Sequence, residues 1–135
     1  MATTDQALLE TDRTALRRHR ERGSFDRELA LSIIDEAYIA HVGISTPEGP
    51  LVLPMTYGRI DDSLYLHGAV GNAILRSAAG VQVCVTFTIL DGLVLARSAF
   101  HHSMEYRSVV LFGEGARVDD EAEKLASLEA LVDHV

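Results

Sequence analysis

Residues 101–113 carry the densest set of reactive side chains in the chain: two histidines, a glutamate, an arginine and two serines, ahead of an apolar run. Buried polar and charged side chains cost free energy unless they are paired or bind a ligand, so this segment predicts one wall of a binding site. Read as a strand, it places Arg107 on one face and Ser108 on the other. A guanidinium and a hydroxyl suit a phosphate or a heteroaromatic ring. Pairing of Arg107 with Glu105, or with an acidic residue of another strand, is an equally good interpretation.

A second candidate is the junction at residues 64–73, where a strand ends at His67 and two glycines lead into the start of a helix. Backbone N–H groups at a helix start are unpaired, and glycine lets an anion approach closely, so the junction is typical of a phosphate site. Asn72 adds a donor and Arg76 adds a cation one turn further on. The pattern is weak on its own, because glycines at such junctions are more often plain turn residues.

Pro54 lies inside an expected strand, in the sequence Leu53-Pro-Met-Thr-Tyr57. Proline has no N–H to donate to a neighbouring strand, so it interrupts the ladder. The strand is therefore at an edge or a bulge, or its backbone faces a planar ligand and offers Thr56 and nearby main-chain groups to it.

The other histidines and serines give little support for metal or triad chemistry. His101 and His102 are adjacent, so a strand points them to opposite faces and they cannot share a metal ion. No other spaced His, Cys and Glu set occurs, and no Gly-x-Ser-x-Gly elbow supports a Ser-His-Asp triad. His41 is expected to be a half-buried, satisfied histidine of the first strand. We therefore predict no metal site.

Length and composition indicate one domain over residues 1–135, with a flexible tail at residues 1–12. The 47% of hydrophobic residues is enough for a core without disulfides. The formal net charge of −8 argues against a nucleic-acid partner, because duplex binding needs clustered cations. The arginines of residues 13–22 are interpreted as a solvated arm or a subunit contact. Small molecules and a second protein chain remain as partners.

Location follows from two further observations. No stretch is long and apolar enough to cross a bilayer, and the first residues lack the order of a signal peptide, so no membrane partner is expected. Cys84 is the only cysteine, in an apolar alternation that predicts a small core residue. A cytoplasmic location is the natural interpretation.

The elements that must position these side chains follow from periodicity. Ser24 or Asp26 caps a first helix, Gly80 ends a short helix over residues 69–79, and acidic residues from Asp119 begin a last helix. That last helix carries Leu125, Leu128, Val132 and Val135 on one side. Strands are expected over residues 38–45, 51–59, 64–67, 81–90, 93–99 and 101–118, with a hairpin at Asp91-Gly92. This order predicts a mainly β fold, a six-stranded antiparallel barrel with flanking helices, and a sandwich is the alternative.

Taken together, four motifs in order resemble the FMN-binding split-barrel proteins related to pyridoxamine 5′-phosphate oxidase, most closely the branch of nitroimidazole-resistance reductases. The motifs are Pro54-Met-Thr-Tyr57, Leu64-Tyr-Leu-His-Gly-Ala69, Asp91-Gly-Leu-Val-Leu-Ala-Arg-Ser98, and Ser103-Met-Glu-Tyr-Arg-Ser-Val109 followed by Phe112-Gly113. The likeness covers residues 13–135. It is specific at the level of the family.

The resemblance implies a homodimer of six-stranded split barrels with FMN at the subunit interface. It implies that residues 53–57 lie along the flavin ring and ribityl chain, that residues 67–76 receive the phosphate, and that residues 106–109 add side-chain contacts. The candidate cofactor contacts are Pro54, Met55, Thr56, Tyr57, His67, Gly68, Ala69, Asn72, Arg107 and Ser108, with Arg76 as the added cation of the junction. His67 is the candidate catalytic residue, as a donor to flavin or substrate.

The chain also departs from the family pattern. Relatives often carry Ser-Arg-Lys or Gly-Arg-Lys where this chain reads Gly71-Asn-Ala73, so two phosphate-directed cations are missing. The substrate-binding residues of true pyridoxamine phosphate oxidases are not recognisable, so that reaction is not assigned. Members of the branch commonly continue past the position of Val135.

The leading hypothesis is an FMN-dependent oxidoreductase, a flavin reductase or nitroreductase-like protein that passes electrons from NAD(P)H or another donor to a small acceptor. The alternative is a non-catalytic flavin- or haem-binding protein on the same barrel. A third hypothesis is a dimeric scaffold that binds no ligand, and the two missing phosphate-directed cations favour it.

Overall fold

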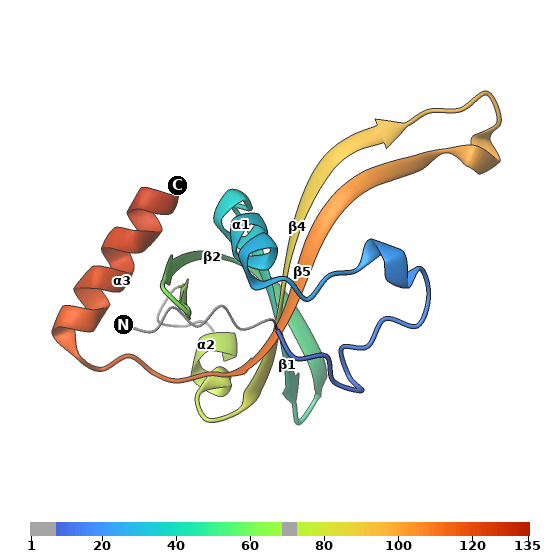
Figure 1. Cartoon of the computed structure of the whole chain (residues 1–135). Coiled ribbons are helices and arrows are strands. Elements are labelled where there is room, and N and C mark those ends of the chain that lie inside the picture. Colours follow the sequence, from blue (N-terminus) through green and yellow to red (C-terminus); the bar gives the residue numbers. More distant parts are fainter. Residues whose placement is uncertain (1–7, 69–72) are drawn as a thin grey trace.

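The computed structural model describes residues 8–68 and 73–135. The helical segments, two of them short 3-10 turns, are η1 (Arg20–Arg22), α1 (Arg27–Glu36), α2 (Ala73–Ala78), η2 (Ala99–His101) and α3 (Glu121–His134), and the strands are β1 (Ala40–Thr46), β2 (Gly49–Ile60), β3 (Ser63–His67), β4 (Gln82–Val94) and β5 (Ser103–Glu114). All strand pairs are antiparallel, and the sheet order is β3-β2-β1-β4-β5. Figure 1 shows β4 and β5 extending far beyond the other strands as an arm. The predicted mainly β, antiparallel fold with flanking helices is confirmed.

The predicted hairpin at Asp91-Gly92 is wrong. Because there is no turn at this position, the described part of the chain has five strands instead of six. β4 runs through this dipeptide, and its register against β5 shifts between Leu90 and Gly92. Asp-Gly here forms a β-bulge, an insertion that bends a strand without ending it. The two strands expected over residues 81–90 and 93–99 are therefore one strand, and the turn lies beyond Val94.

The core lies on one face of the sheet, here called the inner face. Of the two caps that the sequence offered, Asp26 caps α1: its carboxylate accepts hydrogen bonds from the N–H groups of Glu28 and Leu29. The buried residues of α1 join strand residues in a single cluster: Ile33, Ile34, Ala37, Ala40, Val42, Ile44, Met55, Tyr57, Ala78, Val83, Val85, Phe87 and Val109. Strand alternation sends the intervening residues to the opposite, outer face. Figure 1 shows α1 beside β4 and β5.

Helix α3 packs on β2 through a close approach that only glycine permits. A Cβ added at Gly58 would lie 2.7 Å from the backbone N of Leu131. The helix is further fixed by the Tyr65 hydroxyl, 2.9 Å from Glu123 Oε1, and by His134 Nε2, 2.7 Å from the Ala37 carbonyl oxygen. The apolar side found in the sequence is left exposed: Leu125 is 60%, Leu128 44%, Val132 71% and Val135 78% accessible.

Two shorter predictions fall partly outside the described residues. The helix expected over residues 69–79 is described only as α2, and Gly80 follows it with φ +75°, as a glycine that ends a helix should. Of the flexible tail expected over residues 1–12, the structure describes residues 8–12, and the flexibility stays a prediction. There the N–H of Leu8 donates to the Phe25 carbonyl over 2.9 Å, and this ties the segment to the start of α1.

Candidate functional site

The outer face brings together three of the predicted site residues. Pro54 of β2 lies opposite His41 of β1, and Thr56 of β2 lies opposite His67 of β3. Directly opposed residues of an antiparallel pair share a face, and all four side chains are exposed. Proline, threonine and two imidazoles thus form one accessible patch, here called the β2 patch.

The backbone of β2 has an open edge next to this patch. Residues 49–55 pair with β1, whereas pairing with β3 begins only at Thr56. Within the described residues, no strand pairs with the other edge of β2 before Thr56. Pro54 is tolerated because it lies in this edge stretch, as one interpretation of the sequence required. Alternate residues of an antiparallel strand direct their main-chain groups to opposite edges, so Leu53 and Met55 face β1 and Pro54 faces the open edge. The Pro54 carbonyl oxygen is therefore placed to accept a hydrogen bond from a planar heterocycle.

Two predicted contacts, Met55 and Tyr57, point away from the patch into the core. Met55 is 6% and Tyr57 0% accessible. The Tyr57 hydroxyl donates to the carbonyl oxygens of Ile34 and Ala37, and burial raises the pKa of Tyr57 to about 12. Their side chains therefore cannot contact a ligand on the outer face.

Arg107 also lies on the inner face, away from the patch, because it opposes Ile89 while Ser108 opposes Thr88. Its Nη1 and Nη2 donate to both carboxylate oxygens of Glu36 over 2.8 Å, and Nε and Nη2 donate to both oxygens of Asp91 over 2.9 Å. These bonds lower the pKa of both carboxyls and raise that of Arg107. The guanidinium is therefore committed to two carboxylates, one of them on another strand, and not to Glu105.

Ser108 shares the outer face with the β2 patch but lies on the far side of the sheet. The order β3-β2-β1-β4-β5 puts two strands between β2 and β5. With neighbouring strands about 4.8 Å apart, Ser108 is about 14 Å from β2 along the sheet. One chain cannot bring Ser108 and Thr56 onto the same small ligand unless that ligand spans the sheet.

The predicted phosphate junction is described only at its ends. Gly68 directly follows β3, and Arg76 is exposed on α2. Ala69 and Asn72 lie outside the described residues, so the predicted contacts at these two positions stay predictions.

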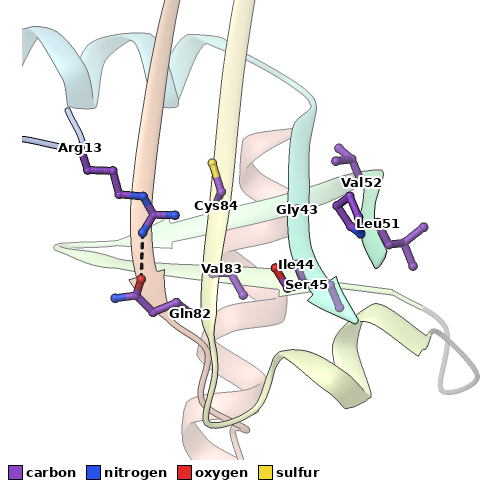
Figure 2. Close-up of a pocket in the computed structure, with 10 residues that line it drawn as sticks. Arg13, Gly43, Ile44, Ser45, Leu51, Val52, Gln82, Val83 and Cys84 are labelled. Atoms are coloured by element: carbon purple, nitrogen blue, oxygen red, sulfur yellow. Dashed lines mark hydrogen bonds between the residues drawn. The ribbon is translucent and has the colours of Figure 1, made fainter. Parts of the chain in front are cut away.

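Sequence reasoning misplaced two residues that the structure puts on the outer face. His41 is exposed, not half-buried, and Cys84 is half-buried on the outer face, not in the core. The signal was available, since Ala40, Val42 and Ile44 alternate around His41, and Val83 and Val85 flank Cys84. Cys84 lines a shallow pocket of about 220 Å³, together with Gly43 and Ser45. Figure 2 shows the residues of this pocket and Arg13, whose Nη1 donates to Gln82 Oε1 over 2.9 Å.

Two other classes of feature are absent from the described residues. Residues 8–68 and 73–135 contain no group of three His, Cys, Asp or Glu side chains that could hold a metal ion. No helix among them is long and apolar enough to cross a membrane.

Comparison with known proteins identifies the family. Residues 26–135 match the family model described as pyridoxamine 5′-phosphate oxidase. The chain therefore belongs to the pyridoxamine 5′-phosphate oxidase family, and its sheet is the split barrel of that family, as the sequence motifs indicated. No curated protein matches the sequence.

Three solved structures are similar in both sequence and fold. The flavocytochrome Anf3 from Azotobacter vinelandii is 35% identical, with a TM-score of 0.82 over 92% of this chain and 58% of that chain. The FAD and heme binding protein from Mycobacterium smegmatis is 38% identical, with a TM-score of 0.71 over 80% of this chain and 53% of that chain. A protein from Bacteroides thetaiotaomicron assigned to 5-nitroimidazole antibiotic resistance is 32% identical, with a TM-score of 0.65 over 81% of this chain and 66% of that chain. The matches thus span about half to two thirds of the length of these proteins.

Proposed function

We propose that the β2 patch binds a flavin, specifically FMN, and that the protein is an FMN-dependent oxidoreductase acting on a small-molecule acceptor. The observation that carries this proposal is the open backbone edge of β2 beside Pro54, Thr56 and His67. A flavin ring has hydrogen-bonding groups along one edge and apolar faces, which match unpaired main-chain groups next to proline. Bound flavin supplies the electron-transfer chemistry, and the protein supplies position and electrostatics.

In this proposal each residue of the patch has a separate task. The Pro54 carbonyl oxygen at the open edge orients the ring, and the Thr56 hydroxyl donates a hydrogen bond to it. His67 lies nearest the reacting region, as a donor to flavin or substrate. Gly68 begins the segment that receives the phosphate, and exposed Arg76 supplies a cation there. Arg107 is assigned no direct contact, because Glu36 and Asp91 already bind its guanidinium.

The placement of Ser108 supports a homodimer. Because Ser108 lies across the sheet from Thr56, it reaches the same flavin most simply from a second copy of the chain. Apolar side chains left exposed on the β4–β5 arm give such a copy a surface to cover, including Leu90 at 58%, Leu93 at 67% and Tyr106 at 59% accessibility. We therefore propose a homodimer with flavin between the subunits.

Electrons would come from NAD(P)H and pass to a small acceptor, for which a nitroaromatic compound is the first candidate. The similarity to the Bacteroides thetaiotaomicron resistance protein supports this acceptor class. A single unbridged cysteine is compatible with the reducing cytoplasm, where we propose that the protein works.

A second candidate function is non-catalytic binding of flavin or haem on the same barrel. It is favoured by the names of two similar proteins, a flavocytochrome and an FAD and heme binding protein. The visible spectrum of the purified protein, followed by anaerobic addition of NADPH, distinguishes the two candidates. Bleaching of a flavin spectrum at a catalytically useful rate supports the oxidoreductase, whereas stable flavin that NADPH does not reduce, or a haem Soret band, supports the binding protein.

Substitution of Thr56 tests whether the β2 patch is the flavin site. Loss of one hydrogen bond to the ring predicts a Kd for FMN that is about five- to tenfold weaker in Thr56→Ala. The matched control is Ser127→Ala, which removes a half-buried hydroxyl on α3 that donates to the Lys124 carbonyl in the same helix. Equal FMN affinity in Thr56→Ala, Ser127→Ala and the wild type would contradict the proposed site.

A further inference from the structure

A second pocket lies away from the β2 patch, between the face of α1 that meets the sheet and the strands β3 and β5. Its volume is about 260 Å³. Its walls are apolar, formed by Leu31 and Ile34 of α1, Leu64 of β3, Leu111 of β5 and Leu8 of the N-terminal segment. Interiors are normally filled to crystal-like density, so an unfilled pocket with largely apolar walls is a place where an apolar group can be buried. The proposed flavin contacts do not line it.

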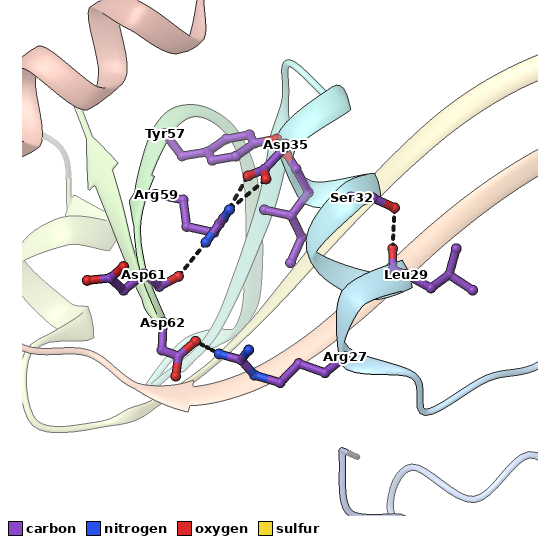
Figure 3. A network of polar contacts seen from close by, with 9 residues as sticks. Arg27, Leu29, Ser32, Asp35, Tyr57, Arg59, Asp61 and Asp62 are labelled. Carbon is purple, nitrogen blue, oxygen red and sulfur yellow. Dashed lines mark hydrogen bonds and ion pairs between the residues drawn. The ribbon is translucent and has the colours of Figure 1, made fainter. Parts of the chain in front are cut away.

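Two arginines at the mouth of this pocket differ in how firmly they are paired. Arg59 donates through Nε and Nη2 to both oxygens of Asp35 over 2.6 Å, and through Nη1 to the Asp61 carbonyl oxygen. Arg27 has one carboxylate partner, Asp62, on the turn between β2 and β3. Figure 3 shows both pairs and the Arg27 side chain reaching across to Asp62.

Exposure makes the Arg27–Asp62 pair replaceable. The Arg27 side chain is 29% accessible, whereas Asp62 is 73% accessible. An ion pair with so exposed a carboxylate contributes little to stability, because water solvates the carboxylate almost as well. Asp62 can therefore turn to solvent while the guanidinium of Arg27 stays at the mouth of the pocket.

We propose that this pocket binds a medium-chain carboxylate. The alkyl chain lies between Leu31, Leu64 and Leu111, and the carboxylate takes the place of Asp62 on Arg27 as a charge-assisted hydrogen-bond partner. Apolar walls alone would accept any small hydrocarbon, but the cation at the mouth selects an anionic head. At about 260 Å³ the pocket is smaller than a typical ligand site, which limits the alkyl chain to a medium length at most.

Titration with straight-chain carboxylates from butanoate to octanoate, followed by NMR of the ligand, tests the proposal. Each added methylene should tighten binding about fourfold until the pocket is full. Arg27→Gln should weaken octanoate binding about tenfold. Asp62→Asn removes the competing carboxylate and should tighten it about two- to fivefold. These two substitutions break the same ion pair, so opposite effects cannot come from loss of stability.

A matched pair of substitutions on α1 tests the location. Leu31→Trp fills the pocket and should abolish octanoate binding, whereas Leu29→Trp should leave it unchanged, because Leu29 is 45% accessible and points away from the ion pairs in Figure 3. Circular dichroism checks that each variant is folded. If Leu31→Trp fails to fold, the Arg27→Gln and Asp62→Asn variants test the proposal by themselves.

No octanoate binding at millimolar concentration, an unchanged Kd in Arg27→Gln, or weaker binding in Asp62→Asn would overturn the proposal. FMN affinity is expected to be the same in all four variants.

Discussion

At the scale of single residues, strand alternation decides which side chains can reach a ligand. Residues that are adjacent in the sequence lie on opposite faces of the sheet. Thr56 faces outward, whereas Met55 and Tyr57 are buried. Ser108 faces outward, whereas Arg107 faces inward and is bound by Glu36 and Asp91. Motif matching treats these positions as one set. The structure divides them into residues that can contact a ligand with their side chains and residues that shape the sheet behind it.

His67→Ala tests the proposed donor. Loss of a hydrogen bond to the reacting system predicts a kcat for NADPH-dependent acceptor reduction that is at least about tenfold lower. FMN affinity should change less than kcat, since most of the flavin contacts lie elsewhere. His19→Ala, at an exposed histidine of the N-terminal segment, is the control. Turnover unchanged in His67→Ala would remove His67 from the mechanism.

Tyr57 predicts a specific loss of stability in alkali. Its folded-state pKa of about 12 lies above the ordinary value of 10.0, so the neutral phenol is favoured in the folded protein. The stabilisation is fully present below pH 10 and is lost as the pH rises from 10 to 12. Urea unfolding of the wild type and Tyr57→Phe across this range measures it. The difference in unfolding free energy between the two proteins should shrink with rising pH, and a constant difference would contradict the assignment.

At the scale of elements, the bulge in β4 takes part in an ion-pair network between helix and sheet, here called the Arg107 network. Arg107 of β5 joins Glu36 at the end of α1 to Asp91 in the bulge, and so fixes the base of the β4–β5 arm to α1. Asp91-Gly92 looked like a hairpin in the sequence because the same dipeptide suits both structures. Only the long-range pairing with β5 distinguishes them, and local sequence does not contain it.

The Arg107 network predicts that the folded protein loses stability in acid. The pKa values of Glu36 and Asp91 are lowered from 4.5 and 3.8, first of all by hydrogen bonds from Arg107. The contribution to stability is therefore present above these values and is lost as the pH falls through the lower folded-state values. Arg107→Gln should flatten the fall in urea midpoint below about pH 4.5. The control is Arg117→Gln, which breaks an exposed ion pair with Asp119. An equal effect of Arg107→Gln and Arg117→Gln on the urea midpoint would argue against a role of the Arg107 network in stability.

Substitution of Gly58 tests how closely α3 must approach the sheet. A methyl group there meets the backbone of Leu131 at 2.7 Å, so Gly58→Ala should destabilise the protein by about 1–3 kcal/mol through forced displacement of α3. A Cβ at Gly113 meets nothing within 4 Å, so Gly113→Ala is the matched control and should be neutral or slightly stabilising. Thermal unfolding of both variants makes the measurement. Equal midpoints would mean that α3 is free to move away from β2.

At the scale of the whole molecule, the sequence was sufficient for the fold class and the family. The α1 cap at Asp26, one of two candidates in the sequence, the glycine after α2 and the presence of a strand at β1 depend on local chemistry, and they were predicted. The exposed positions of His41 and Cys84 follow from the same alternation but were passed over. The strand count, the partner carboxylates of Arg107 and the close contact at Gly58 depend on residues far apart in the chain, so local patterns could not supply them.

The molecule as a whole is proposed to be a dimer whose flavin lies against β2 of one subunit. Gel filtration with light scattering of the purified protein mixed with FMN, followed by the visible spectrum of the eluted peak, tests this most directly. The proposal predicts a particle of two chains that retains about one flavin per chain, with the wild type retaining more than Thr56→Ala. A folded protein that elutes without flavin after mixing with excess FMN would contradict it.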